Sequence, residues 1–502
     1  MICVIFGIIS HFFRLNSSAS INWSFFMYSG IVLLLSAVLT ALALLLFRGR
    51  ETAFDRFIKC AVIAFLVVGF FRFMLSDSFT FVINGGFYDN IFYDKTDPLQ
   101  TILRWGYYLN YAIIPMAVFY ESRLFRNIAS YVCLPFSVLS AVFFEDFMPY
   151  FLADTGRGLR MTVGFRYFYF ALELTLAVSV TLIALIKKKH YFNVKSKKEW
   201  LDFLVATPLI ILLMMPVYTP QSLFGYSKLI AEKGSVYHFG WLLILLTVTL
   251  ALYYSFRFRP YVERRMLVVF LSIVLFFHYD SLYLMGFSIP RLPIQLCNLA
   301  AYFFIFAFVF NMPRFAQFCF LTNTTGTLIA LILPDFLLGA FGFWNMHFVL
   351  EHSLVLMIPA LAMGLRLCDR PTKKSLKYAF IGFSVYFVFC LTVGTILNGY
   401  SDVTGFEVNY FFLFDLDKAL GMFPFLEFVR KFNVTFGRFG FNPLFVSIIY
   451  VAFQLLTVGF YKAVRFFERM EDDHFALRRS AIELYERRTG KTVKIPRELP
   501  ND

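Results

Sequence analysis

Two residues that can together break an ester bond occur in the second half of this sequence, Cys297 and His352. A thiolate attacks acyl carbonyl groups readily, and a neighbouring imidazole can accept the thiol proton as a general base. Such a pair would form a thioester with an acyl group and pass that group to a second substrate. We therefore take Cys297 and His352 as the candidate catalytic residues.

His352 stands out because another stretch of the chain is nearly the same without it. FVLEHSL at 348–354 resembles FALELTL at 170–176, where Leu174 takes the place of His352. An ionisable residue within a membrane segment indicates a functional site. Structural alternatives remain open, because a membrane Cys often only fills space and a membrane His can simply bond to a neighbouring helix.

Other polar residues of the second half can orient the imidazole or stabilise an oxyanion. These supporting candidates are Gln295, Asn298, Asn323, Glu351 and His278. Asn323 belongs to a polar run, TNTTGT, and is expected nearer the middle of the membrane than Cys297. Glu351, like Glu173 in the first half, is expected at an outer helix end, where water would satisfy its charge.

The elements that carry these residues are predicted to be transmembrane helices. The sequence is 59% hydrophobic and 16% charged, and it contains apolar runs long enough to cross a hydrocarbon core of roughly 30 Å. Thirteen runs occur, at 24–47, 57–75, 103–120, 126–144, 164–186, 201–219, 238–256, 265–287, 293–312, 315–334, 347–366, 378–397 and 443–463. The predicted fold is an all-α polytopic transmembrane bundle.

The net charge of +14 is explained by topology rather than by nucleic-acid binding. One set of alternate loops holds 21 Lys or Arg in 52 residues, and the other set holds 10 in 126 residues. Basic loops stay in the cytoplasm, which predicts an extracytoplasmic N-terminus and a cytoplasmic C-terminus in the cell membrane. The expected partners are membrane lipids.

The seven Cys residues do not indicate a metal site or a disulfide framework. They are scattered, with no CxxC pair and no finger-like spacing to the seven His residues. We expect no metal and no other cofactor.

The predicted orientation places Cys297 and His352 at a similar depth. A helix starting at Pro293 would hold Cys297 about 6 Å below its outer end, at 1.5 Å per residue. A helix starting at residue 347 would hold His352 about 7.5 Å below its outer end. In the first turn, Cys297 would also feel the positive end of the helix dipole, which favours a thiolate.

The two halves of the chain resemble each other in several places. FRGRETAFDRF at 47–57 resembles FRFRPYVERRM at 256–266, and further pairs of segments follow in the same order. Because an even number of helices separates them, the predicted duplication is parallel. The expected domains are a degenerate membrane repeat at 1–237, a seven-helix unit at 238–465, and a basic amphipathic tail at 466–502. The tail could lie on an anionic leaflet or remain in solvent.

Four segments of the second half resemble the YwaF-type bacterial integral membrane proteins in order and spacing. They are LPIQLCNLA at 292–300, GTLIALILPDF at 326–336, EHSLVLMIP at 351–359 and NYFFLF at 409–414. This family, which the chain resembles over about residues 265–465, is distantly similar to a eukaryotic multipass ether-phospholipid acyltransferase family. The resemblance implies Cys297 as nucleophile and His352 as base. The family's flanking His and Asp are Gln295 and Asn298 here.

Three functions are compatible with this pattern. The first is a thiol-dependent lipid acyltransferase acting near the outer leaflet. The second is a transporter built from two parallel repeats, since such repeats are a known transporter design. The third is a non-catalytic lipid-binding membrane protein.

The charge asymmetry predicts which loops face the outside. Cysteines introduced in 398–442 should react with a membrane-impermeant thiol reagent in intact cells, whereas cysteines in 187–200 should react only after permeabilisation. The reverse pattern of labelling would contradict the predicted orientation.

Overall fold

The computed structural model describes residues 23–74, 98–151, 162–188, 196–220, 230–285, 292–336, 339–405, 407–422, 424–436 and 439–489. Within these ranges eight helical stretches are long and apolar enough to cross a membrane. They are Met27–Leu46, Arg123–Val142, Val163–Ile186, Val236–Phe256, Pro313–Ile332, Phe343–Gly364, Lys373–Gly399 and Pro443–Met470. A multipass α-helical membrane protein is therefore confirmed.

Each of the thirteen predicted runs overlaps a helix, but five of these helices do not qualify as membrane spans by length and composition. The five are α3 (Glu51–Met74), α5 (Pro98–Phe119), α10 (Lys197–Leu213), α13 (Tyr261–Met285) and α14 (Leu296–Phe304). The structure also contains a small antiparallel hairpin, β1 (Val434–Phe436) and β2 (Phe439–Phe441), within the predicted loop 398–442.

The chain divides into two compact units. Unit 1 comprises residues 1–229, 277–288 and 339–347, and unit 2 comprises the remainder. The helices that lie wholly in unit 1 are α2 (Trp23–Leu46), α3, α5, α6 (Arg123–Ile128), η2 (Ala129–Cys133), α7 (Leu134–Val142), α8 (Phe144–Phe151), α9 (Val163–Lys188) and α10. Helix α9 contacts α2, α3 and α7, and it is therefore the central helix of unit 1.

A buried charged cluster lies on α9. Glu173 is fully buried and accepts a hydrogen bond from the hydroxyl of Tyr111. The guanidinium of Arg72 lies 3.8 Å from the Glu173 carboxylate and 4.2 Å from the ring centre of Tyr107. The expectation that water satisfies Glu173 at an outer helix end was therefore wrong, because the charge is paired inside the protein.

Unit 2 holds the segments that resemble a known family. Its helices are α12 (Val236–Phe256), most of α13, α14, η4 (Ile305–Val309), α15 (Pro313–Phe318), η5 (Cys319–Asn323), α16 (Thr324–Ile332), most of α17 (Phe343–Gly364), α18 (Lys373–Gly399), α19 (Ser401–Thr404), η6 (Tyr410–Phe412), α20 (Leu416–Met422), η7 (Pro424–Phe432) and α21 (Pro443–Thr489). An aromatic core at Phe383, Phe387 and Phe453 joins α18 to α21.

Two stretches, one in each unit, have the same internal construction. In unit 1, α6, η2 and α7 have lengths of 6, 5 and 9 residues. In unit 2, α15, η5 and α16 have the same three lengths. In both stretches a single π-helical turn interrupts a membrane span, as a duplication would leave it. The duplication itself remains a prediction.

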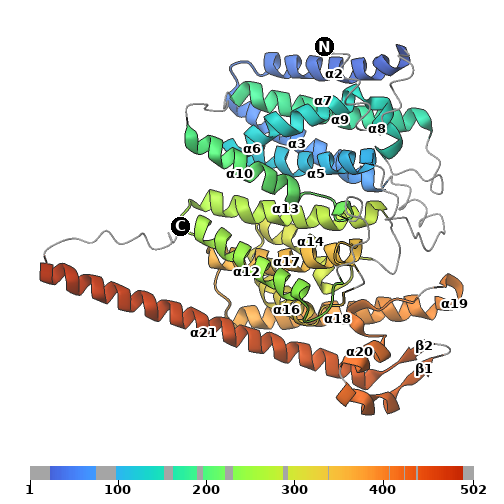
Figure 1. Ribbon diagram of the computed structural model, residues 1–502, viewed down its shortest axis with the longest axis vertical. Helices are drawn as coiled ribbons and strands as arrows, with labels where there is room; N and C mark the ends of the chain where they lie inside the picture. The colour runs from blue at the N-terminus through green and yellow to red at the C-terminus, as the bar shows by residue number, and fades with distance from the viewer. Residues whose placement is uncertain are drawn as a thin grey trace. The chain divides into compact units, whose positions relative to one another are not determined.

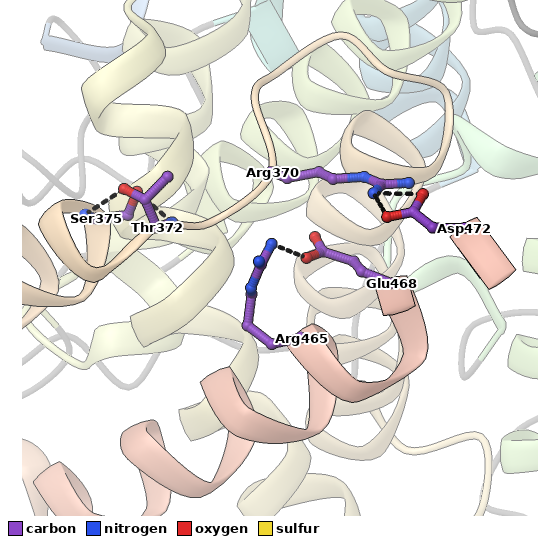
Figure 2. Close-up of polar contacts among 6 residues, drawn as sticks. All are labelled: Arg370, Thr372, Ser375, Arg465, Glu468 and Asp472. Carbon is purple, nitrogen blue, oxygen red and sulfur yellow. Dashed lines mark hydrogen bonds and ion pairs between the residues drawn. The ribbon is translucent and has the colours of Figure 1, made fainter. Parts of the chain in front are cut away.

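Helix α21 continues without a break from its membrane span to Thr489 and forms a single long rod (Figure 1). The sequence predicted a span that ends near residue 463 and a basic amphipathic tail from residue 466, whereas the helix of the span continues into this tail. The loop before α18 contacts this extension through Arg370, whose Nη1 lies 2.8 Å from Asp472 (Figure 2). Residues 490–502 of the predicted tail lie outside the described residues.

Removing one partner of the buried pair in unit 1 should destabilise the protein. Glu173→Gln leaves the charge of Arg72 buried without its counter-charge, so the free energy of unfolding should fall by about 3 kcal/mol. Thermal unfolding in detergent would show this as a lower midpoint.

Glu199→Gln is the matched control, because the Arg123–Glu199 pair of unit 1 lies at the surface, with side chains 59% and 23% exposed, and should contribute less than about 1 kcal/mol. Equal midpoints for Glu173→Gln and Glu199→Gln would show that the buried pair contributes no more to stability than a surface pair.

Candidate functional site

The candidate site is built on the start of α14, where consecutive residues are bonded to distant parts of unit 2. The carbonyl of Ile294 accepts a hydrogen bond from the hydroxyl of Tyr386 on α18, at 3.0 Å. The carbonyl of Leu296 accepts one from the side-chain amide of Asn323 in η5, at 2.7 Å. These bonds fix the backbone on both sides of Gln295, directly before Cys297.

Gln295 attaches the segment 409–414 to this helix start. Its Nε2 donates to the carbonyl of Asn409 at 2.9 Å, and its Oε1 accepts from the backbone N–H of Phe411 at 2.8 Å. The side-chain amide of Gln295 therefore both donates to and accepts from the backbone of this segment, as one strand does with its neighbour in a β-sheet. Gln295 takes the N-cap position of α14, but its side chain does not cap the helix.

The attached segment has an unusual backbone. Phe411 and Phe412 have φ values of 54° and 56°, a left-handed conformation that costs about 1–2 kcal/mol per residue. The ring of Phe411 compensates by packing among Phe383, Tyr386 and Phe453. These contacts hold the segment 409–414 in one conformation beside the start of α14, and we call this segment the plug.

The ring of Phe414, the last residue of this segment, packs directly against the backbone of Gly394 on α18. A Cβ atom at Gly394 of α18 would lie 2.1 Å from the ring of Phe414. The neighbouring Asn398 bonds to both the carbonyl and the N–H of Val408, at 3.0 and 2.7 Å. The sequence pointed to NYFFLF at 409–414 but not to Tyr386, Gly394 or Asn398, whose roles depend on long-range pairing.

Cys297 is the second residue of α14 and is half-buried. Its thiol donates to the side-chain oxygen of Asn298, with Sγ 3.2 Å from Oδ1. Because no side chain caps this first turn, its N–H groups are available to stabilise negative charge on the sulfur or on an attached oxygen.

His352 has a defined tautomer when neutral. Its Nδ1 lies 2.7 Å from the carbonyl of Phe348, one turn earlier on α17. A carbonyl only accepts, so Nδ1 carries the proton and Nε2 carries a lone pair. Nε2 is therefore the nitrogen that can act as a base. The ring is buried and stacks near Phe348, with centroids 4.2 Å apart.

The helices that carry Cys297 and His352 begin at other residues than the sequence predicted. Helix α14 begins at Leu296 rather than Pro293, so Cys297 lies one residue inside its helix. Helix α17 begins at Phe343, which places His352 about 13 Å along its helix at 1.5 Å per residue. Helix geometry alone thus no longer gives the two residues a similar depth.

Three of the five supporting candidates act at the start of α14, and the other two lie elsewhere. Gln295, Asn298 and Asn323 all act at the start of α14, as described above. Glu351 is buried, so the expectation that water satisfies its charge at an outer helix end was wrong. His278 belongs to unit 1, where its Nε2 bonds to the carbonyl of Leu213 at 2.7 Å.

The eight candidate spans define a multipass membrane protein. Within this class, residues 234–453 match the TMEM164 family, a multipass membrane family related to ether-lipid acyltransferases. The match covers less than half of the chain and includes Cys297, His352 and the segment 409–414. It agrees with the expected relation to ether-phospholipid acyltransferases, although it does not name the YwaF-type family. No curated protein and no solved structure matches the chain.

Removing the Gln295 side chain should release the plug. In Gln295→Ala, hydrogen–deuterium exchange of the backbone amides in 409–414 should accelerate by roughly ten- to thirtyfold, because two hydrogen bonds of about 1 kcal/mol each are lost. Mass spectrometry of the corresponding peptide would measure the change.

Gln317→Ala is a control of the same chemistry, since the Gln317 side chain accepts its hydrogen bond from Ser375 of α18, at 2.9 Å. If exchange in 409–414 were equal in the two variants, Gln295 would not be what holds this segment.

Proposed function

We propose that this protein is a thiol-dependent lipid acyltransferase in which Cys297 is the nucleophile and His352 is the general base. The substrates would be phospholipids or similar lipids, which reach a membrane site directly from the bilayer. The proposal includes a site facing the outer leaflet, as the loop charges predict, and a parallel arrangement of two membrane repeats.

The proposed reaction has two halves that balance. Nε2 of His352 takes the thiol proton, the sulfur attacks the ester carbonyl of a donor lipid, and the tetrahedral intermediate expels the lysolipid alkoxide. The imidazolium returns the proton to that alkoxide, and an acyl thioester remains on Cys297. In the second half, the imidazole accepts the proton of an acceptor hydroxyl, whose oxygen attacks the thioester carbonyl. The C–S bond then breaks, the acyl group remains on the acceptor as an ester, and the imidazolium returns its proton to the Cys297 thiolate.

The observation that carries the proposal is the ordered start of α14 with a thiol in its uncapped first turn. The N–H groups of this turn suit an oxyanion, and Asn298 and Asn323 hold the thiol and the backbone in place. The Nδ1 bond of His352 leaves its other nitrogen in the basic form. The match to a family related to ether-lipid acyltransferases supports the same chemistry.

The thioester can be detected directly. Acyl-biotin exchange on the protein from membranes supplied with phospholipid should give a hydroxylamine-dependent signal that Cys297→Ala abolishes. His352→Gln should slow formation of the signal by roughly 10²- to 10⁴-fold, the usual contribution of a general base. The lipid profile of the same cells should change in both variants.

Cys60→Ser is the control, because Cys60 is an exposed thiol of unit 1 and its loss should leave signal and lipid profile unchanged. A signal that survives in Cys297→Ala would refute the assignment of the nucleophile. If the protein forms no thioester and the lipid profile stays unchanged in every variant, the acyltransferase proposal is wrong, and a transporter or a non-catalytic lipid-binding protein remains.

A further inference from the structure

The segment η7 presents an unusual apolar face. Phe425 and Phe428 are 74% and 52% exposed, whereas phenylalanine side chains are usually buried in the protein core. Because side chains three residues apart eclipse each other in a 3₁₀-helix, the two rings share one face, which we call the aromatic face of η7. Phe432, at the end of η7, is also 52% exposed.

The opposite side of η7 is anchored to the first turn of α21. Val429 is fully buried and packs in one cluster with Phe445 of α21. The side chain of Asn442 donates to the carbonyl of Val429 at 2.9 Å and accepts from the N–H of Phe445 at 2.9 Å. Since Pro443–Met470 is a candidate membrane span, η7 is held level with the end of that span.

The charges around the aromatic face suit a lipid surface. Arg430 pairs with Asp417 and Glu427, both at 2.7 Å, and with the neighbouring Lys431 these four charges sum to zero. These two partners raise the pKa of Arg430 further above its usual value. Lys431 is exposed and follows Phe428 by three residues, where its ammonium group can reach a lipid phosphate.

We propose that the aromatic face of η7 inserts into the phospholipid bilayer at its interface, with Lys431 at the level of the phosphates. Exposed phenylalanine rings beside a basic residue are typical of segments that lie in the membrane interface. The anchor on α21 places the rings where the hydrocarbon region begins, so the bilayer that surrounds the span extends directly over this face. This inference does not depend on the proposed acyltransferase activity.

Insertion would also set the position of the plug beside Cys297. The plug and η7 belong to one connection between α18 and α21, and the plug is bonded to Gln295. This connection would then contact the bilayer through η7 and α14 through the plug. Lipid would therefore lie close to the candidate site.

Fluorescence quenching by brominated lipid tests the insertion. The purified full-length Phe428→Trp variant, reconstituted into phosphatidylcholine vesicles, should gain a blue-shifted emission relative to the wild-type protein. Bromine atoms near the upper end of the acyl chains should quench this added emission, because interfacial side chains insert about 5–10 Å into the headgroup and acyl boundary.

Asp473→Trp is the control, because Asp473 is exposed and lies beyond the span on the extension of α21. Its added emission should be red-shifted and unaffected by brominated lipid. If the emission of Phe428→Trp resisted quenching as that of Asp473→Trp does, the aromatic face would lie in water. The proposal would then be overturned, and a protein partner would be the occupant to seek.

Discussion

The hydrogen bonds at the start of α14 are the constraint on which the candidate site depends. Three consecutive residues bond to three separate elements: Ile294 to α18, Gln295 to the segment 409–411, and Leu296 to η5. Partners so far apart in sequence can meet only when unit 2 is fully folded. The position of the Cys297 thiol is therefore a property of the whole unit rather than of its own helix.

The sequence predicted the helices well and their ends less well. Hydrophobic runs depend on local composition, so every predicted run overlaps a helix. The start of α14 was misplaced because residues 292–295 form a turn held by Tyr386 and by the paired amide of Gln295, which no local pattern reveals. The left-handed backbone of Phe411 and Phe412 and the burial of Glu173 were missed for the same reason, since each requires a partner distant in sequence.

The two units use similar sequences differently. On α9, Leu174 is a buried core residue, and the charge of its neighbour Glu173 is directed to Arg72 and Tyr111. On α17, His352 replaces the corresponding apolar side chain and orients its basic nitrogen by bonding to Phe348. A buried ion pair stabilises only when both partners are present, which suits a structural role in unit 1. An imidazole with one nitrogen fixed suits proton transfer in unit 2.

The proposed reaction requires the Cys297 thiol and the His352 imidazole to face each other, and thiol cross-linking tests this most directly. In a His352→Cys variant, a short bifunctional methanethiosulfonate reagent should join the new thiol to Cys297, and mass spectrometry should find the linked peptides. The same reagent should fail with Ser353→Cys, because Ser353 lines an apolar pocket with His238 and Trp241. Linkage through residue 353 but not 352 would show that the imidazole faces away from the thiol and would contradict the proposed catalytic pair.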